Sequence, residues 1–332
     1  MGTRGRWVAF AVVAAGLLAA LAWLLPIHSG LGAAPQDFRG KNLSGYDMRG
    51  ASLQGANFDG AILVGANLVG AKMRHASFRL ADLREAYLRD ADMRDADLTG
   101  ALVGGADLTR ADLRSAHLDR ADLSLARLDS ARLDDASLRS AFLPGASLVK
   151  ASLTAAHLEG SMLANADLTQ AVLARAVMID ADLGAQESGQ QGPAAAKLKG
   201  ADLRHADLTG ANLTSVDMRE AILEGAVFVS ARLGHADLSW ARGRDADFSR
   251  ATLGFVKAYG VDLRGARFVG AFLTDAQLEG GDLSGANLAE AVLDNANLNQ
   301  TNMSNTDVTK AKATHVLANG VSNLPLFLRE AK

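Results

Sequence analysis

Apolar residues recur with a period of five along almost the whole chain. Nearly every residue whose number ends in 3 or 8 is Leu, Phe or Met, from Phe38 to Leu183 and from Leu198 to Val308. Two positions before most of these residues stands Ala, and the residue between the two is most often Asp, Asn or Ser. A fixed internal period of this kind is the signature of a repeat architecture.

A period of five fits neither a helix nor a flat strand. In a helix, each residue turns the chain by about 100°, so leucines spaced by five would point in all directions. In a strand, an odd period sends successive leucines to opposite faces. Both conflicts disappear if the chain bends by the same angle after every five residues and coils around an axis. The pattern therefore predicts a β-coil with Leu and Ala inside and the other three positions facing water.

The phenylalanines indicate how many sides the coil has. Six of them occupy the central repeat position in two series with a spacing of twenty: Phe38, Phe58, Phe78, Phe228, Phe248 and Phe268. Twenty residues are four repeats, so we predict a four-sided coil in which these rings stack in one core column. The two series come into register when ten residues are removed between Leu183 and Leu198. This offset predicts an inserted loop over residues 186–195.

The repeats resemble those of the pentapeptide-repeat family. Ala111-Asp112-Leu113-Arg114-Ser115 and Ala211-Asn212-Leu213-Thr214-Ser215 both match the family consensus of a small residue, Asp or Asn, Leu or Phe, and two polar residues. The resemblance covers residues 38–310 and implies an all-β fold, a right-handed quadrilateral β-helix. The expected organisation is an N-terminal signal-anchor or signal peptide (1–34), a first part of the β-helix (35–185), the inserted loop (186–195), a second part (196–310) and a C-terminal capping segment (311–332).

An uncharged run from Trp7 to Ile27 is long enough to cross a bilayer as a helix. Arg4 and Arg6 precede it and favour a cytoplasmic N-terminus. Three interpretations stay open: an uncleaved membrane anchor through residues 7–27, a signal peptide removed on export, and a buried helix of a cytosolic protein. The first two place the repeats outside the cytoplasm, in the cell envelope.

The composition narrows the function classes. The chain has 34 basic and 37 acidic residues, a net charge of −3 and no Cys. The absence of Cys excludes disulfides and Cys-based zinc sites. The balanced charge argues against nucleic acid as a partner. Arg74, Arg94 and Arg114 are twenty residues apart and should form a ladder on one face, which nearby acidic residues must neutralise.

The many carboxylates do not indicate catalysis. Asp occupies the same repeat position again and again, where its side chain hydrogen-bonds nearby backbone at the turns. A catalytic pair needs unequal environments, and repetition makes these environments alike. His117 and His157 share a column but lie two coils apart, too far to bind one metal ion. We therefore predict no enzyme, no metal site and no cofactor.

The outer surface becomes apolar after residue 141. Phe142 and Met162 stand twenty apart at an outward position, and further outward apolar residues follow nearby: Val149, Val172, Val177 and Ile179. The inserted loop, with its polar residues Gln186, Glu187, Gln190 and Gln191, leaves the coil just beyond. Exposed apolar patches and loops inserted into repeats both mark binding surfaces. Local tolerance of apolar residues, self-association of rods and a loop without function remain open alternatives.

Two repeats lack the inward Leu, at Gly243 and Ala258. Trp240, Phe255 and Tyr259 stand close to them in the sequence and are expected to fill or cover these gaps. The irregularity is interpreted as a local packing defect.

The first functional hypothesis is a non-enzymatic structural and protein-interaction module, membrane-anchored or exported. The alternative follows from the resemblance, because some pentapeptide-repeat proteins mimic duplex DNA, bind type II topoisomerases and protect against quinolones. The near-neutral charge and the N-terminal apolar run argue against that alternative. A third hypothesis is an enzyme-accessory or polymer-binding role at the cell envelope.

Overall fold

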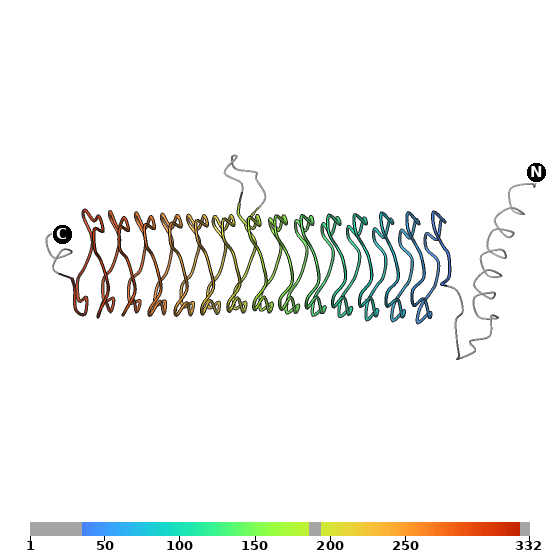
Figure 1. Ribbon diagram of the computed structural model, residues 1–332, viewed down its shortest axis with the longest axis horizontal. Coiled ribbons are helices and arrows are strands. Elements are labelled where there is room, and N and C mark those ends of the chain that lie inside the picture. The colour runs from blue at the N-terminus through green and yellow to red at the C-terminus, as the bar shows by residue number, and fades with distance from the viewer. Residues whose placement is uncertain (1–34, 186–193, 326–332) are drawn as a thin grey trace, which may run out of the picture.

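The computed structural model describes residues 35–185 and 194–325, which form one straight rod (Figure 1). These residues contain no helix, and every fifth residue makes a β-bridge of a single residue. The predicted N-terminal helix lies outside the described residues, as do residues 186–193 of the predicted loop and residues 326–332 of the predicted cap. No helix that could span a bilayer occurs in the part of the chain that the structure describes.

The bridges run in four parallel columns, which are the four faces of the rod. Each bridge joins residues twenty apart, from Asp37 and Asn57 at one end to Asn302 and Ser322 at the other. We name the faces by the first bridge residue of each column: face A from Asp37, face B from Asn42, face C from Asp47 and face D from Ser52. The corners between them are AB, BC, CD and DA. The predicted four-sided coil is confirmed.

Hydrogen bonds between coils pair the backbone N–H and C=O groups, although the chain has no long strand. The N–H of Leu83 donates to the carbonyl of Leu102, nineteen residues on, at 2.7 Å, and the N–H of Asp82 donates to Ala61 of the preceding coil at 2.9 Å. A third bond, from the N–H of Ala86 to the carbonyl of Leu83 at 3.0 Å, closes the corner. The same three bonds recur repeat after repeat. Buried backbone groups therefore find partners despite the constant bending.

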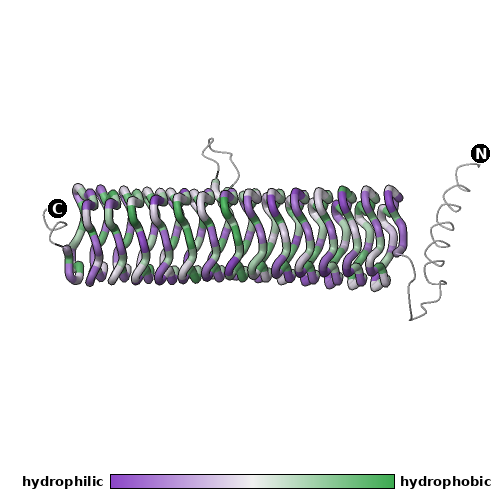
Figure 2. The backbone as a smooth tube through the Cα atoms, viewed as in Figure 1, coloured by the Kyte–Doolittle hydropathy of each residue, from purple (hydrophilic) through white to green (hydrophobic). Residues whose placement is uncertain are grey.

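The core is a continuous column of Leu, Ala and Phe side chains, and the hydropathy alternates along the tube accordingly (Figure 2). Phe58 is fully buried, and its ring stacks on Phe38 and Phe78 with centroids 4.7 and 4.8 Å apart. In the second series, Phe248 stacks on Phe228 at 4.7 Å and on Phe268 at 5.0 Å. These spacings equal the usual separation of paired strands, about 4.8 Å. The predicted aromatic column is confirmed.

At Gly243, one of the two repeats without an inward Leu, a core side chain fills the space. A Cβ atom on Gly243 would lie 3.0 Å from Cδ2 of Leu263, so the leucine of the next coil occupies the space. Of the two expectations, that nearby aromatic residues fill the gaps or cover them, the first is wrong. Their side chains lie on the surface instead, with exposed fractions of 65 %, 53 % and 37 % for Trp240, Phe255 and Tyr259. They stand at corner positions, where the backbone directs side chains outward.

The insertion adds ten residues without disturbing the columns. Across it, the bridges join residues thirty apart, such as Asp167 with Lys197 and Asp182 with Asn212. The N–H of Ala196 donates to the carbonyl of Leu183 at 2.8 Å, the bond that otherwise closes a corner within three residues. The chain therefore leaves the rod at corner BC after residue 185 and resumes the same path (Figure 1).

The coil continues past residue 310, where the leucine pattern fades. Lys312, Leu317 and Ser322 still bridge to Val292, Asn297 and Asn302 of the preceding coil. The first part of the segment that was expected to cap the rod is therefore its last turn. Backbone pairing carries the fold here, although the apolar period no longer predicts it.

Candidate functional site

Face B carries most of the apolar surface that is not at a corner. Twelve large apolar side chains are exposed on the described rod, and five of them are bridge residues of face B: Ile62, Leu102, Phe142, Met162 and Phe272. Within the described residues, face C carries two, Tyr87 and Leu317, and faces A and D carry none. The rod therefore has one face suited to apolar contacts.

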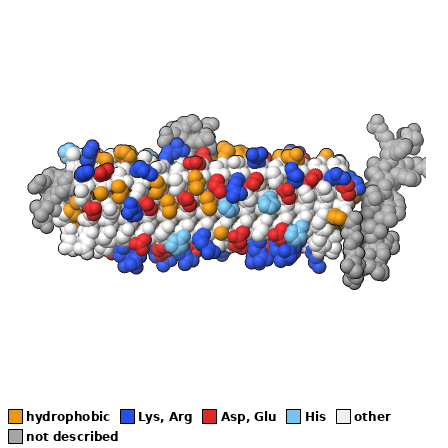
Figure 3. Space-filling view, viewed as in Figure 1, with side chains coloured by type: hydrophobic (Ala, Val, Ile, Leu, Met, Phe, Trp, Pro, Cys, Tyr) orange, Lys and Arg blue, Asp and Glu red, His pale blue; other side chains and the backbone are white. Residues whose placement is uncertain are grey.

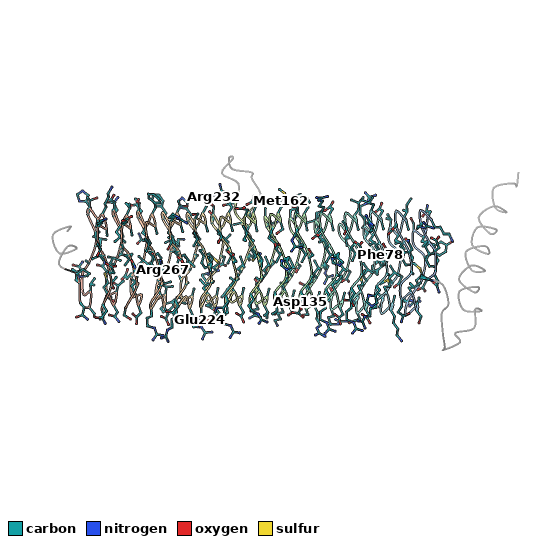
Figure 4. All side chains as sticks on the ribbon, in the orientation of Figure 1. Phe78, Asp135, Met162, Glu224, Arg232 and Arg267 are labelled. Atoms are coloured by element: carbon teal, nitrogen blue, oxygen red, sulfur yellow. The ribbon has the colours of Figure 1, made fainter. Side chains whose placement is uncertain are left out.

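Phe142 and Met162 are the densest part of this face. They bridge each other on successive coils, and their exposed fractions are 41 % and 44 %. Face B then continues through Asp182, Asn212 and Arg232. Met162 and Arg232 lie along one edge of the rod in Figure 4, the edge at which the chain leaves the coil. The apolar pair is thus one coil away from the insertion.

The structure separates the other predicted patch residues. Val172 is a bridge residue of face D, opposite face B, and Val149 lies at corner CD. Val177 lies on face A. Ile179 lies at corner AB, and its carbonyl accepts the N–H of Gly160 at 2.9 Å, which places it beside the coil of Met162. Of these four residues, Ile179 alone adjoins the Phe142–Met162 pair.

The predicted loop residues Gln186, Glu187, Gln190 and Gln191 lie outside the described residues. The base of the loop is described at Ala185, whose N–H donates to the carbonyl of Thr214 at 3.0 Å. This bond holds corner BC in its ordinary geometry up to the point of exit. The predicted proximity of the coil exit to Met162 agrees with the bridge between Met162 and Asp182.

Sequence reasoning missed three members of the apolar column, Ile62, Leu102 and Phe272. Ile62 and Leu102 alternate along face B with Asp82 and Asp122, so a local search for apolar clusters does not find them. The apolar column is visible in the sequence when every twentieth residue from Asn42 is compared. That comparison is possible only once the four-sided register is known.

The repeated aspartates hold the corners, as predicted. Oδ1 of Asp97 accepts the N–H of Thr99 at 2.9 Å, and Oδ1 of Asp282 accepts the N–H of Ser284 at 2.9 Å. Where Arg stands two residues after Asp, an ion pair forms as well. Arg204 donates to the two carboxylate oxygens of Asp202 at 2.9 and 2.6 Å, and this hydrogen bond lowers the pKa of Asp202.

The arginine ladder is neutralised coil by coil. Arg94 pairs with Asp92 at 2.7 Å, and Arg114 pairs with Asp112 at 2.6 Å. Arg74 reaches Asp95 of the next coil at 3.0 Å. The visible surface in Figure 3 accordingly mixes both signs of charge along the rod. This surface offers no extended field of one sign.

The titratable groups of the described residues do not converge on a metal site. No group of three or more His, Asp or Glu side chains in this part of the chain could hold an ion. His117 and His157 lie on face A with Ser137 between them. The separation of two coils that the repeat period predicts is therefore confirmed.

A four-sided parallel β-coil with an apolar bore and a charge-balanced exterior defines a solenoid repeat protein. The family model of pentapeptide repeats matches residues 36–100, 106–184 and 194–316 of the sequence. The chain belongs to the pentapeptide-repeat family, whose fold is the right-handed β-helix predicted from the resemblance. Right-handed crossovers between parallel bridges are also the rule for β-structure.

Several solved pentapeptide-repeat proteins are similar to this chain. HetL of the cyanobacterium Nostoc sp. strain PCC 7120, involved in regulating heterocyst differentiation, is 28% identical over 86% of this chain and 95% of its own, with a TM-score of 0.29. QnrB1, a plasmid-mediated fluoroquinolone resistance protein, is 20% identical over 52% of this chain and 89% of its own (TM-score 0.26). A thylakoid-lumen protein of Arabidopsis thaliana is 25% identical over 42% and 69% (TM-score 0.22). A comparison with curated proteins gives no match.

Proposed function

We propose that this rod is a non-enzymatic module that recognises a protein through face B. The observation that carries the proposal is the bridged pair of Phe142 and Met162, both more than two-fifths exposed, one coil from the insertion. Ile62 and Leu102 extend the same face toward the N-terminal end. Apolar side chains held outward on a rigid sheet gain free energy when a partner removes them from water.

The charge pattern supports a protein partner. A nucleic-acid partner needs a run of unpaired basic groups. Here the arginines of the ladder are paired with aspartates of their own or the next coil. A protein interface needs an apolar centre with a polar rim, which face B supplies where Asp122 and Asp182 flank the Phe142–Met162 pair.

We propose further that residues 7–27 direct the rod to the cell envelope, as a membrane anchor or as a cleaved signal. The support is the uncharged run in the sequence. The first bridge residue, Asp37, follows Ile27 by ten residues, so an anchor would hold the rod by its N-terminal end. Protease added to intact spheroplasts should digest the repeat domain. A domain that is protected would favour the cytosolic, topoisomerase-binding alternative.

The recognition surface is tested with a matched pair of substitutions. Phe142→Asp places a charge on face B, and Val172→Asp places one on face D, opposite it. Both should fold, because Asp is a common residue at the bridge position, as at Asp122 and Asp202 in the same two columns. In vivo crosslinking to the native partner should be lost in Phe142→Asp and kept in Val172→Asp. Equal crosslinking in both variants would remove face B as the recognition surface.

A further inference from the structure

Trp240 forms an exposed flat platform at corner CD. Its ring carbons Cε3, Cζ3 and Cη2 all lie within 2.8 Å of the position that a Cβ atom on Gly260 would occupy. Three neighbouring ring atoms can be so nearly equidistant from one point only when the face of the ring, and not its edge, covers that point. The indole therefore lies flat over Gly260 and turns its other face to solvent, with 65 % of the residue exposed.

The corner is bare beyond this ring. A Cβ atom on Gly280, the next residue of the same corner, would meet only the backbone nitrogen of Gly260, at 4.0 Å. One coil further, Gln300 leans onto Gly320, since its Cγ lies 3.6 Å from the corresponding position there. The corner thus has a stretch of open backbone that begins at the edge of the indole.

Aromatic and polar side chains flank the open stretch. Tyr259, 37 % exposed, precedes Gly260, and Glu279 precedes Gly280. Oε2 of Glu279 accepts a hydrogen bond from Nδ2 of Asn297 at 3.2 Å, which orients the carboxylate along face C. The corner therefore combines a stacking face with hydrogen-bonding groups beside a smooth backbone.

We propose that corner CD from Trp240 to Gly280 binds a carbohydrate, a chain of hexopyranose units. The C–H face of one sugar ring stacks on the outer face of Trp240. The next unit lies over Gly280, where no side chain obstructs it, and its hydroxyls donate to Glu279 and to the hydroxyl of Tyr259. Pyranose rings have apolar faces and polar rims. This corner offers an apolar surface, the ring of Trp240, with polar groups of Tyr259 and Glu279 beside it.

Other partners fit the corner less well. A protein interface is built around a contiguous apolar centre, whereas the two aromatic residues here are bordered by charged and amide side chains. Single-stranded nucleic acid also stacks on aromatic rings, but it needs basic groups for its phosphates, and Glu279 would repel them. A proline-rich peptide uses aromatic grooves as well, and the experiment below separates that case.

The fluorescence of Trp240 can report binding directly. The sequence has three Trp residues, so a full-length chain with Trp7→Phe and Trp23→Phe keeps Trp240 as its single emitter. Titration with cellohexaose and with chitohexaose should give a saturable change in its emission for at least one of the two sugars. Tyr259→Ala and Glu279→Gln should each raise the Kd at least fivefold. Decaproline should produce no change.

Two further variants keep the test independent of the fluorophore. By calorimetric titration, Trp240→Ala should abolish sugar binding, and Gly280→Gln, which fills the bare corner, should weaken it at least tenfold. Leu125→Ala is the matched control, since Leu125 is an exposed corner side chain that leans over Gly145 in the same way at another corner. It should leave the Kd unchanged. Absence of saturable binding by both sugars, unchanged affinity in Trp240→Ala, or binding of decaproline in their place would overturn the proposal.

Discussion

Asp182 and Asn212 are bridge partners although thirty residues separate them. Nδ2 of Asn212 donates to Oδ1 of Asp182 at 2.8 Å, and the N–H of Leu183 donates to the carbonyl of Asn212 at 2.9 Å. Elsewhere along face B the partner is twenty residues away, as for Met162 and Asp182. Ten residues have been added at a corner, and the coils on both sides pair as if they were absent.

Removing residues 186–195 should therefore leave the rod intact. The deletion joins Ala185 to Ala196 and restores a five-residue phase from Leu183 to Leu198. Loop-closure entropy changes slowly with loop length, so the expected change in Tm is no more than about 3 °C. Circular dichroism melts would measure it. Deleting residues 184–195 is the control, because it removes two corner residues as well and should destabilise the rod strongly. Equal melting of both deletions would contradict the register described here.

The fold could be predicted from the sequence because the same pattern recurs in every repeat. A single repeat is compatible with a helix, a strand or a β-coil. The series of Phe38, Phe58 and Phe78 indicates four sides, and the offset of Phe228 indicates the insertion. Each inference used residues whose side chains point inward, where one geometry serves every coil. Core positions constrain one another through close packing, so their pattern determines the architecture.

The surface was harder to predict for the same reason. Val172 follows Met162 closely in the sequence, yet the two lie on opposite faces, because five residues turn the chain by a quarter of a coil. Trp240 stands close in the sequence to the core gap at Gly243, but Leu263 fills that gap from the next coil. The surface neighbours of an outward residue are twenty positions away in the sequence, so residues that are close in the sequence are not neighbours on the surface.

Three bulky corner residues, Leu80, Leu125 and Trp240, each lie over a glycine one coil later. Leu80 leans over Gly100, where an added Cβ would lie 2.8 Å from Leu80 Cδ2. Gly60 stands at the same corner with nearly the same φ, and nothing lies within 4 Å of its Cβ position. Gly60→Ala should thus cost about 1–2 kcal/mol for the left-handed backbone alone, and Gly100→Ala should cost more. Urea denaturation would compare them.

The contact between Leu80 and residue 100 can be isolated by a second substitution. Adding Leu80→Ala to Gly100→Ala should return the loss of unfolding free energy to the level of Gly60→Ala. If the double variant remains as unstable as Gly100→Ala, the difference between the two glycines comes from the backbone and not from Leu80.

Acid should weaken the rod through its Asp–Arg pairs. The Arg39 guanidinium hydrogen-bonds Asp37 and lowers the pKa of that carboxyl to about 2, and Arg204 lowers the pKa of Asp202 in the same way. Unfolded Asp titrates near 3.9. A carboxyl whose pKa is lowered by folding stabilises the protein above the unfolded value, and this stabilisation is lost as the pH falls through the folded value. The Tm should be steady from pH 8 to 5 and fall below about pH 4.

Arg204→Gln tests one pair within that trend. At pH 7 it should lower the free energy of unfolding by about 0.2–1 kcal/mol, as for other exposed ion pairs. As the pH falls through the lowered pKa of Asp202, the carboxyl becomes protonated in both proteins, so the difference should shrink. A deficit that is the same at pH 7 and pH 2 would show that Arg204 acts through packing.

The stacked rings should stabilise the rod through the volume that they fill more than through their aromatic character. Phe58 is fully buried between two parallel rings, and Leu98 occupies the same column two coils beyond Phe58, also fully buried. Phe58→Ala leaves a cavity between coils and should cost about 3–5 kcal/mol. Phe58→Leu restores a side chain that the column already accepts and should cost less than about 1.5 kcal/mol. Phe272→Ala, on the half-exposed surface of face B, should stay within about 0.5 kcal/mol of the parent protein.

Hydrogen exchange is the suitable measurement for this series, because a solenoid can open coil by coil. The loss of protection in Phe58→Ala should centre on the amides that pair its coil with the next, such as that of Phe58 with the carbonyl of Ser77. Amides beyond the insertion should keep their protection, since each coil contacts only its neighbours. Uniform loss of protection along the rod would mean that the coils unfold as one unit, and it would contradict this account of nearest-neighbour stability.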